Sequence, residues 1–185
     1  TREESGLRSW KMRLHIGEST TPQSVGEVLR ILNIPVVIIP SQNDPTPIGF
    51  PQPPISPLLM GLNPNTTPTT NPCMFSVGDI TFLCHSGEST RHVAEETGLS
   101  VLESQKILLK WRHLIPSAPS HLKLQGNSDE AFIVKRLPHV LVIGGCKGLE
   151  IDECAGCRLI GLPRFCMTNE AVKLDLRTGA VEVLS

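Results

Sequence analysis

The chain has 185 residues, enough for one domain with a sizeable core, and its 39% hydrophobic and 19% charged residues are typical of a globular protein. Its formal net charge of -1 argues against autonomous, avid binding to nucleic acid or to an anionic membrane. No apolar run approaches the length of a membrane span. Because the chain opens on Thr1, we expect it to be part of a longer protein.

The first third of the chain predicts few regular elements. Residues 1–23 are polar and weakly periodic, so they predict no defined structure. Ser24 and Glu27 have the spacing of a capping box, which favours a short helix over 24–33 that ends before Pro35. The β-branched run 36–39 lies between prolines and predicts a buried parallel strand.

Residues 40–72 hold many prolines, which remove amide donors and fix φ. This predicts an extended loop with at most one short helical turn near residues 58–60. Ile48, Phe50 and Ile55 make the loop too apolar for a free linker, so we expect it to pack on the domain surface or on a partner.

The remaining elements are indicated by turns and caps. Gly78-Asp79 between two alternating runs predicts a hairpin, and a second capping box at Ser100 predicts a helix. We expect further strands at 139–143 and 158–162, and a closing hairpin that pairs 171–176 with 180–184. Together these patterns predict an α/β fold with mixed sheets.

Two loops carry residues that could do chemistry. The turn Ser41-Gln42-Asn43-Asp44 follows a strand, where sites tend to lie, but Asn and Asp also cap their own backbone, so a plain turn is favoured over a catalytic loop. The glycine-rich run 144–148 lacks the length and the Lys-Ser/Thr end of a phosphate-binding loop.

The six cysteines do not form the pattern of a disulfide framework, and reduced thiols are the simpler interpretation. Cys154 and Cys157 have the spacing of a zinc or redox pair. A structural zinc needs four ligands, however, and no second such pair is present, so free thiols are favoured and a metal role stays open. None of the six histidines is paired as HxH or HxxxH.

Five blocks, in order and spanning residues 24–182, resemble the small (B) subunits of DNA polymerases. The third block resembles the delta type, whereas PQPPIS within the first also resembles the alpha type. The blocks are VGEVLRILNIPVVIIPSQNDPTPIGFPQPPISPLLM, TNPCMFSVGDITFLCHSG, KWRHLIPSAPSHL, PHVLVIGGCKG and CRLIGLPRFCMTNEAVKLDL.

The resemblance implies a calcineurin-like metallophosphoesterase β-sandwich with flanking helices and mixed sheets over residues 24–185, following an N-terminal OB domain that this sequence does not show. Active relatives of this fold hold two metals on Asp, His and Asn ligands. Where they have Gly-Asn-His-Asp, this chain has Ser41 to Asp44, with Gln42 and Asn43 as the replacements. Where they have Gly-His-x-His, it has Gly145 and Lys147 at the histidine positions. The resemblance therefore implies a degenerate site with no metal and no cofactor.

The resemblance also implies a function. We expect a non-catalytic scaffold subunit of a replicative DNA polymerase of the delta type in the nucleus, which binds the C-terminal region of the catalytic subunit and further subunits. We expect it to contact DNA only indirectly, through the complex, and not to associate with a membrane. Ile48, Phe50 and Ile55 are the candidate contact with a partner. The alternatives are an alpha- or epsilon-type small subunit, or an active metal-dependent phosphodiesterase or exonuclease.

Overall fold

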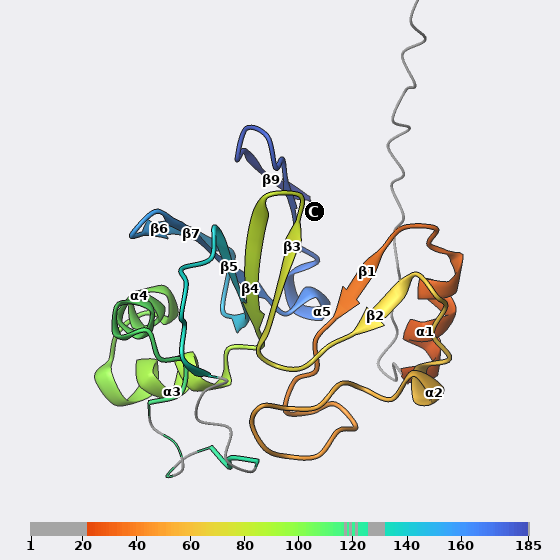
Figure 1. Cartoon of the computed structure of the whole chain (residues 1–185), viewed down its shortest axis with the longest axis horizontal. Coiled ribbons are helices and arrows are strands. Elements are labelled where there is room, and N and C mark those ends of the chain that lie inside the picture. Colours follow the sequence, from red (N-terminus) through yellow and green to blue (C-terminus); the bar gives the residue numbers. More distant parts are fainter. Residues whose placement is uncertain (1–21, 117, 119, 121, 126–131, 185) are drawn as a thin grey trace, which may run out of the picture.

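The computed structural model describes residues 22–116, 118, 120, 122–125 and 132–184. These residues form a mixed α/β structure whose elements are shown in Figure 1. The expectation for residues 1–21 lies outside the described residues. The elements are α1 (Pro22–Ile31), β1 (Val36–Ile38), α2 (Pro57–Met60), β2 (Thr66–Pro68), β3 (Cys73–Val77), β4 (Ile80–His85), α3 (Glu88–Thr97), α4 (Val101–Trp111), β5 (Val140–Cys146), β6 (Glu150–Cys154), β7 (Cys157–Pro163), α5 (Phe165–Thr168), β8 (Ala171–Leu174) and β9 (Val181–Leu184).

A five-stranded sheet in the order β3-β4-β5-β7-β6 is the centre of the main lobe, which we define as residues 73–184. The strands β4, β5 and β7 run parallel, and the antiparallel strands β3 and β6 form the two edges. Helices α3 and α4 lie between β4 and β5 in the chain; α4 packs on one face of the sheet, and α3 packs on α4. The sheet is therefore mixed, as the sequence predicted.

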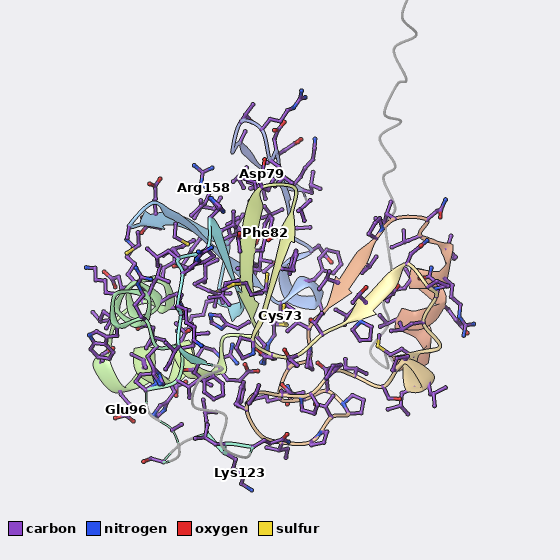
Figure 2. The ribbon with its side chains drawn as sticks, viewed as in Figure 1. Cys73, Asp79, Phe82, Glu96, Lys123 and Arg158 are labelled. Atoms are coloured by element: carbon purple, nitrogen blue, oxygen red, sulfur yellow. The ribbon has the colours of Figure 1, made fainter. Side chains whose placement is uncertain are left out.

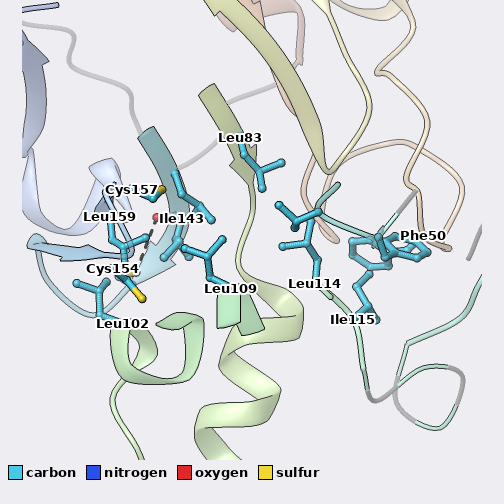
Figure 3. Close-up of a cluster of buried hydrophobic side chains, with 14 residues drawn as sticks. Phe50, Leu83, Leu102, Leu109, Leu114, Ile115, Ile143, Cys154, Cys157 and Leu159 are labelled. Atoms are coloured by element: carbon cyan, nitrogen blue, oxygen red, sulfur yellow. Dashed lines mark hydrogen bonds between the residues drawn. The ribbon is translucent and has the colours of Figure 1, made fainter. Parts of the chain in front are cut away.

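The core lies between this sheet and α4 (Figure 3). Leu102 and Leu109 of α4 pack on Leu141 and other central strand residues because the capping box at Ser100 starts the helix in the right phase. Both bonds of that box form, so this prediction is confirmed. The same cluster includes side chains from loops, among them Phe50, Leu114, Ile115 and Phe132.

The N-terminal lobe, residues 22–72, lies to one side of the main sheet (Figure 1). It holds the parallel pair β1–β2 and the helices α1 and α2. Arg30 Nε donates to the Gly61 carbonyl at 2.6 Å, so the end of α1 is bonded to the end of α2. Of the described residues of this lobe, only Phe50 belongs to the core cluster of the main lobe. The two lobes therefore have largely separate apolar interiors.

The hairpin β8–β9 lies beside the amino ends of the central strands. Leu174 and Leu176 line a small cavity together with Val140 and Arg158, which are direct neighbours in β5 and β7. An Arg158 guanidinium nitrogen donates to the Gly179 carbonyl in the β8–β9 turn.

The structure corrects several details of the sequence-based elements. The first helix begins at Pro22, a residue favoured in the first turn, so Ser24 lies inside the helix and cannot be its N-cap. The strand β1 is parallel as predicted, but it is not buried, since Val37 is 40% exposed. Trp111, the last residue of α4, is 63% exposed. No described helix is long and apolar enough to cross a membrane.

Candidate functional site

The two loops singled out by the sequence lie at the joint between the lobes. The loop from Ser41 to Asp44 follows β1 of the N-terminal lobe, and Gly144 to Lys147 lie at the carboxyl end of β5 and just beyond it. Glu88 and Arg91, in the first turns of α3, stand between them and bind both. The joint, rather than a single strand end, is therefore the candidate site.

Asp44 uses its carboxylate inside its own loop. Its Oδ2 accepts a hydrogen bond from the Ser41 amide at 2.7 Å, and its own amide donates to the Ser41 carbonyl at 3.1 Å. This is the self-capping turn that Asp favours at such positions. The side chains of Gln42 and Asn43 are exposed. The loop thus forms the turn that its sequence predicted.

A charged pair bridges the two loops. Glu88 Oε1 accepts from the Gln42 amide at 3.1 Å and lies 3.8 Å from a guanidinium nitrogen of Arg91. Arg91 Nη1 in turn donates to the carbonyls of Ser86 at 2.9 Å and Gly144 at 3.3 Å. The Glu88 side chain is only 4% exposed, and the Arg91 side chain 25%. A fixed cation thus lies where the two loops approach each other.

The close approach depends on glycine at two positions. Gly145 has φ +69°, and a Cβ there would lie 2.4 Å from Arg91 Nη1. Gly87 has φ +86°, and a Cβ there would lie 2.3 Å from the Gly144 carbonyl oxygen. Both φ values are in the region that glycine adopts without strain. With Arg91 in place, position 145 has no room for a side chain, whereas Lys147 is exposed to solvent.

A buried chain of hydrogen bonds continues from Glu88 into the N-terminal lobe. Ser86 Oγ donates to Glu88 Oε2 and accepts from Asn71 Nδ2. Asn71 Nδ2 also bonds Gln52 Oε1 at 3.3 Å, while Gln52 Nε2 donates to the Ser41 carbonyl at 2.7 Å. Asn71 is 0% exposed and Gln52 3%. Polar side chains this deeply buried are stable only when they are bonded, as they are here.

His85 lies beside this chain as a neutral imidazole. Its Nε2 lies 3.0 Å from Gln105 Oε1, and its Nδ1 accepts from the Gly87 amide at 3.1 Å, which assigns the proton to Nε2. Burial lowers the pKa of His85 to about 4, because it disfavours the charged ring more than the nearby Glu88 carboxylate favours it. The geometry uses this histidine as a bonded core residue.

The cysteine pair of the sequence analysis sits in the core. Cys154 and Cys157 are opposed across the β6–β7 turn and belong to the core cluster (Figure 3). Cys157 is 0% exposed, and burial raises the pKa of its thiol to about 11. Among the described residues, no group of three or more His, Cys, Asp or Glu side chains could hold a metal ion.

The three apolar residues of the proline-rich loop have different environments. Phe50 is 8% exposed and packs in the core, where its backbone bonds the segment at Lys123 and Gln125. Ile55 is 5% exposed, whereas Ile48 is 76% exposed. The loop therefore packs on its own domain through Phe50 and Ile55, and of these three residues Ile48 alone is exposed to solvent.

Sequence reasoning missed Glu88 and Arg91 because it missed α3. This helix is mostly polar and buries Glu88, Ser89 and Thr90, so it lacks an apolar stripe. Two signals could have found it: the acidic residue in the first turn and Gly98 as the left-handed C-cap. The contact between Gln42 and Glu88 joins residues 46 positions apart and leaves no local signal.

Comparison with known proteins identifies the class. The model of the family of DNA polymerase alpha/epsilon B subunits matches residues 18–149, and the chain belongs to this family. It is 33% identical to the DNA polymerase delta small subunit of Arabidopsis thaliana over 82% of the chain and 37% of that relative.

Similarity extends to other delta small subunits. The chain is 32% identical to that of Oryza sativa over 84% of the chain and 38% of the relative, and 25% identical to that of Saccharomyces cerevisiae over 82% and 39%. The chain thus spans less than two fifths of the length of these relatives. The resemblance stated from the sequence blocks is confirmed.

The Asn71→Ala variant tests the buried joint. Because it leaves Gln52 and the Ser86 amide without their buried partner, we expect the free energy of unfolding to fall by about 2 to 3 kcal/mol. Urea unfolding measures this loss. Asn43→Ala is the matched control, since Asn43 is exposed and its loss should change stability by less than about 0.5 kcal/mol. Equal effects of the two variants would contradict a stabilising role for the joint.

The neutral His85 predicts a pH dependence. The pKa of His85 is lower in the folded chain than in the unfolded chain, so the unfolded chain binds the proton more readily. The stability that the neutral His85 contributes is therefore complete above about pH 6.5 and is lost as the pH falls towards 4. We expect the free energy of unfolding to fall by about 2 kcal/mol from pH 7.5 to pH 5 through this residue. His85→Gln keeps a hydrogen-bond donor but cannot titrate. Thermal unfolding of this variant should therefore lack the loss of stability that His85 causes between pH 7.5 and pH 5. The same pH slope in both proteins would refute the assignment.

Proposed function

We propose that the chain is part of an accessory small subunit of a replicative DNA polymerase of the delta type, and that it acts in the nucleus. The observation that carries this proposal is its 32 to 33% identity, over more than four fifths of the chain, to proteins named DNA polymerase delta small subunit. Its role is to bind the C-terminal region of the catalytic subunit and to help assemble further subunits. Contact with DNA is indirect and follows from the complex, in keeping with the net charge of -1.

The fold proposed for the complete subunit is the calcineurin-like sandwich. In support, the five-stranded sheet is mixed and a further antiparallel hairpin, β8–β9, lies beside the amino ends of its central strands. A second β layer would come from parts of the relatives that this chain does not cover. The family model also includes alpha and epsilon subunits, which are the alternative assignment.

We further propose that the phosphoesterase site is degenerate. The carboxylate of Asp44 bonds its own loop, and the cation of Arg91 lies between the two loops that would carry metal ligands. Gly145 stands at a histidine position, has a left-handed φ of +69°, and lies where a Cβ would meet the Arg91 guanidinium. A guanidinium in this place repels divalent metals and cannot activate water as a bound metal does.

Within the proline-rich loop, Ile48 is the residue proposed to contact the partner. Phe50 and Ile55 are buried in the chain itself and shape the loop from inside. An exposed aliphatic side chain held on a loop with a packed base loses little conformational entropy when a partner covers it. The proposed contact thus includes only one of the three residues that the sequence indicated.

Co-purification tests the proposed assembly. We expect the full-length protein to retain a polymerase catalytic subunit, and mass spectrometry of that partner distinguishes the delta type from the alpha and epsilon types. Ile48→Asp should reduce retention, because it introduces a charge into an apolar contact. Ile133→Asp is the control, since Ile133 is also exposed, at 45%, but belongs to the main lobe. Absence of any polymerase subunit would reject the function, and equal retention by both variants would reject only the contact at Ile48.

Hydrolysis tests the degenerate site. With manganese and bis-p-nitrophenyl phosphate, we expect the purified protein to show no activity above the buffer background, because no metal is held to activate water. Asp44→Ala should give the same result. Manganese-dependent hydrolysis that disappears in Asp44→Ala, while the unfolding midpoint stays near that of the unaltered protein, would overturn the proposal.

A further inference from the structure

Cys73 and Cys84 face each other at the base of the β3–β4 hairpin. The two-residue turn after Val77 makes Val77–Ile80 a hydrogen-bonded pair, and Cys73–Cys84 lies four residues further along each strand, so it has the same type. Cα atoms in such a pair are about 5.5 Å apart, within the range that a disulfide spans. Figure 2 shows Cys73 at this base and Asp79 at the hairpin tip.

The two thiols differ in their chemistry. The thiols of Cys73 and Cys84 share a hydrogen bond. This bond lowers the pKa of Cys73, whereas the same bond, together with burial, raises the pKa of Cys84. Cys73 and Cys84 are each 7% exposed, so a molecule as small as a peroxide reaches them through a local opening of the hairpin base. The pair thus combines a nucleophilic thiolate with a neighbouring thiol that can resolve it.

A second opposed pair in the same sheet differs in the chemistry of its thiols, although Cys154, at 9% exposure, is no more buried than Cys73. Cys154 and Cys157 close the turn between β6 and β7, but they sit in the apolar core and Cys157 is 0% exposed. Burial raises the pKa of Cys157, so little thiolate forms near neutral pH. Cys166 is exposed on α5 and has no opposed partner in a strand. The chain therefore contains its own controls for pairing and for exposure.

We propose that Cys73 and Cys84 form a reversible disulfide in response to a hydroperoxide. The Cys73 thiolate attacks one oxygen of hydrogen peroxide and the O–O bond breaks. The hydroxide that leaves takes up the proton lost by the Cys73 thiol and becomes water, while Cys73 becomes a sulfenic acid. The Cys84 thiol then attacks that sulfur and releases a second water. Two thiols and one hydrogen peroxide thus give one disulfide and two waters, and a dithiol such as dithiothreitol reverses the change.

The location gives the disulfide a structural effect. Asn71 lies two residues before Cys73, and Ser86 lies two residues after Cys84. These two side chains bond each other in the joint between the lobes. A covalent bond at the base of the hairpin would fix the spacing of the two segments that carry them. Oxidation would therefore restrict movement between the N-terminal lobe and the main sheet.

The experiment is peptide mapping of the full-length protein, in its complex where it forms one, after treatment with hydrogen peroxide. We expect a Cys73–Cys84 cross-link that dithiothreitol removes, and a fall from six free thiols to four in this part of the chain. Cys73 should react on the order of tenfold or more faster than Cys157, because the thiolate is the reacting form. In Cys84→Ser, dimedone should trap a sulfenic acid on Cys73 without a cross-link.

Cys154→Ser is the matched control and should leave the Cys73–Cys84 cross-link unchanged. A Cys154–Cys157 cross-link at lower peroxide, or Cys73 still unmodified once Cys166 is fully oxidised, would overturn the proposal. Circular dichroism checks that each variant folds, and if a variant fails to fold, mapping of the unaltered protein still decides the outcome.

Discussion

The hydrogen-bonded chain from Gln52 through Asn71 and Ser86 to Glu88 is the constraint on which the arrangement of the two lobes depends. The lobes share little apolar surface in the described residues, since only Phe50 crosses into the core of the main lobe. Their relative placement is therefore set by directional polar bonds. Such bonds specify one geometry more sharply than apolar packing does, but each buried group becomes costly when a partner is lost.

The pair Glu88 and Arg91 converts this joint into a fixed electrostatic unit. The carboxylate holds the amide of Gln42, and the guanidinium holds the carbonyls at the end of β5, so each loop is bound by the charge that suits its exposed backbone group. If the site is degenerate, as proposed above, this pair holds the two loops in place as a metal centre would. It ties loops from distant segments together without supplying a Lewis acid.

The elements predicted correctly are those whose signals are local. The β3–β4 hairpin follows from Gly78-Asp79, and α4 follows from Ser100 and Glu103, because turns and caps involve residues a few positions apart. The helix α3 was missed because its buried face is polar and is satisfied by distant groups such as the Leu114 carbonyl and Gln105. The strand β6 was missed because edge strands carry charges. The site residues Glu88 and Arg91 could not be predicted, because their partners lie tens of residues away in the sequence. The family resemblance was found from the ordered sequence blocks rather than from hydrophobic periodicity.

The two edges of the five-stranded sheet differ in a way that bears on solubility. The edge strand β6 exposes Asp152 and Glu153, and like charges of this kind oppose pairing with another strand. The opposite edge, β3, has the uncharged sequence CMFSV, and its Met74 and Val77 are each about half exposed. Strand addition between copies of the isolated chain is therefore directed to β3. A charged side chain at one of these outward positions would give this edge the same protection that β6 already has.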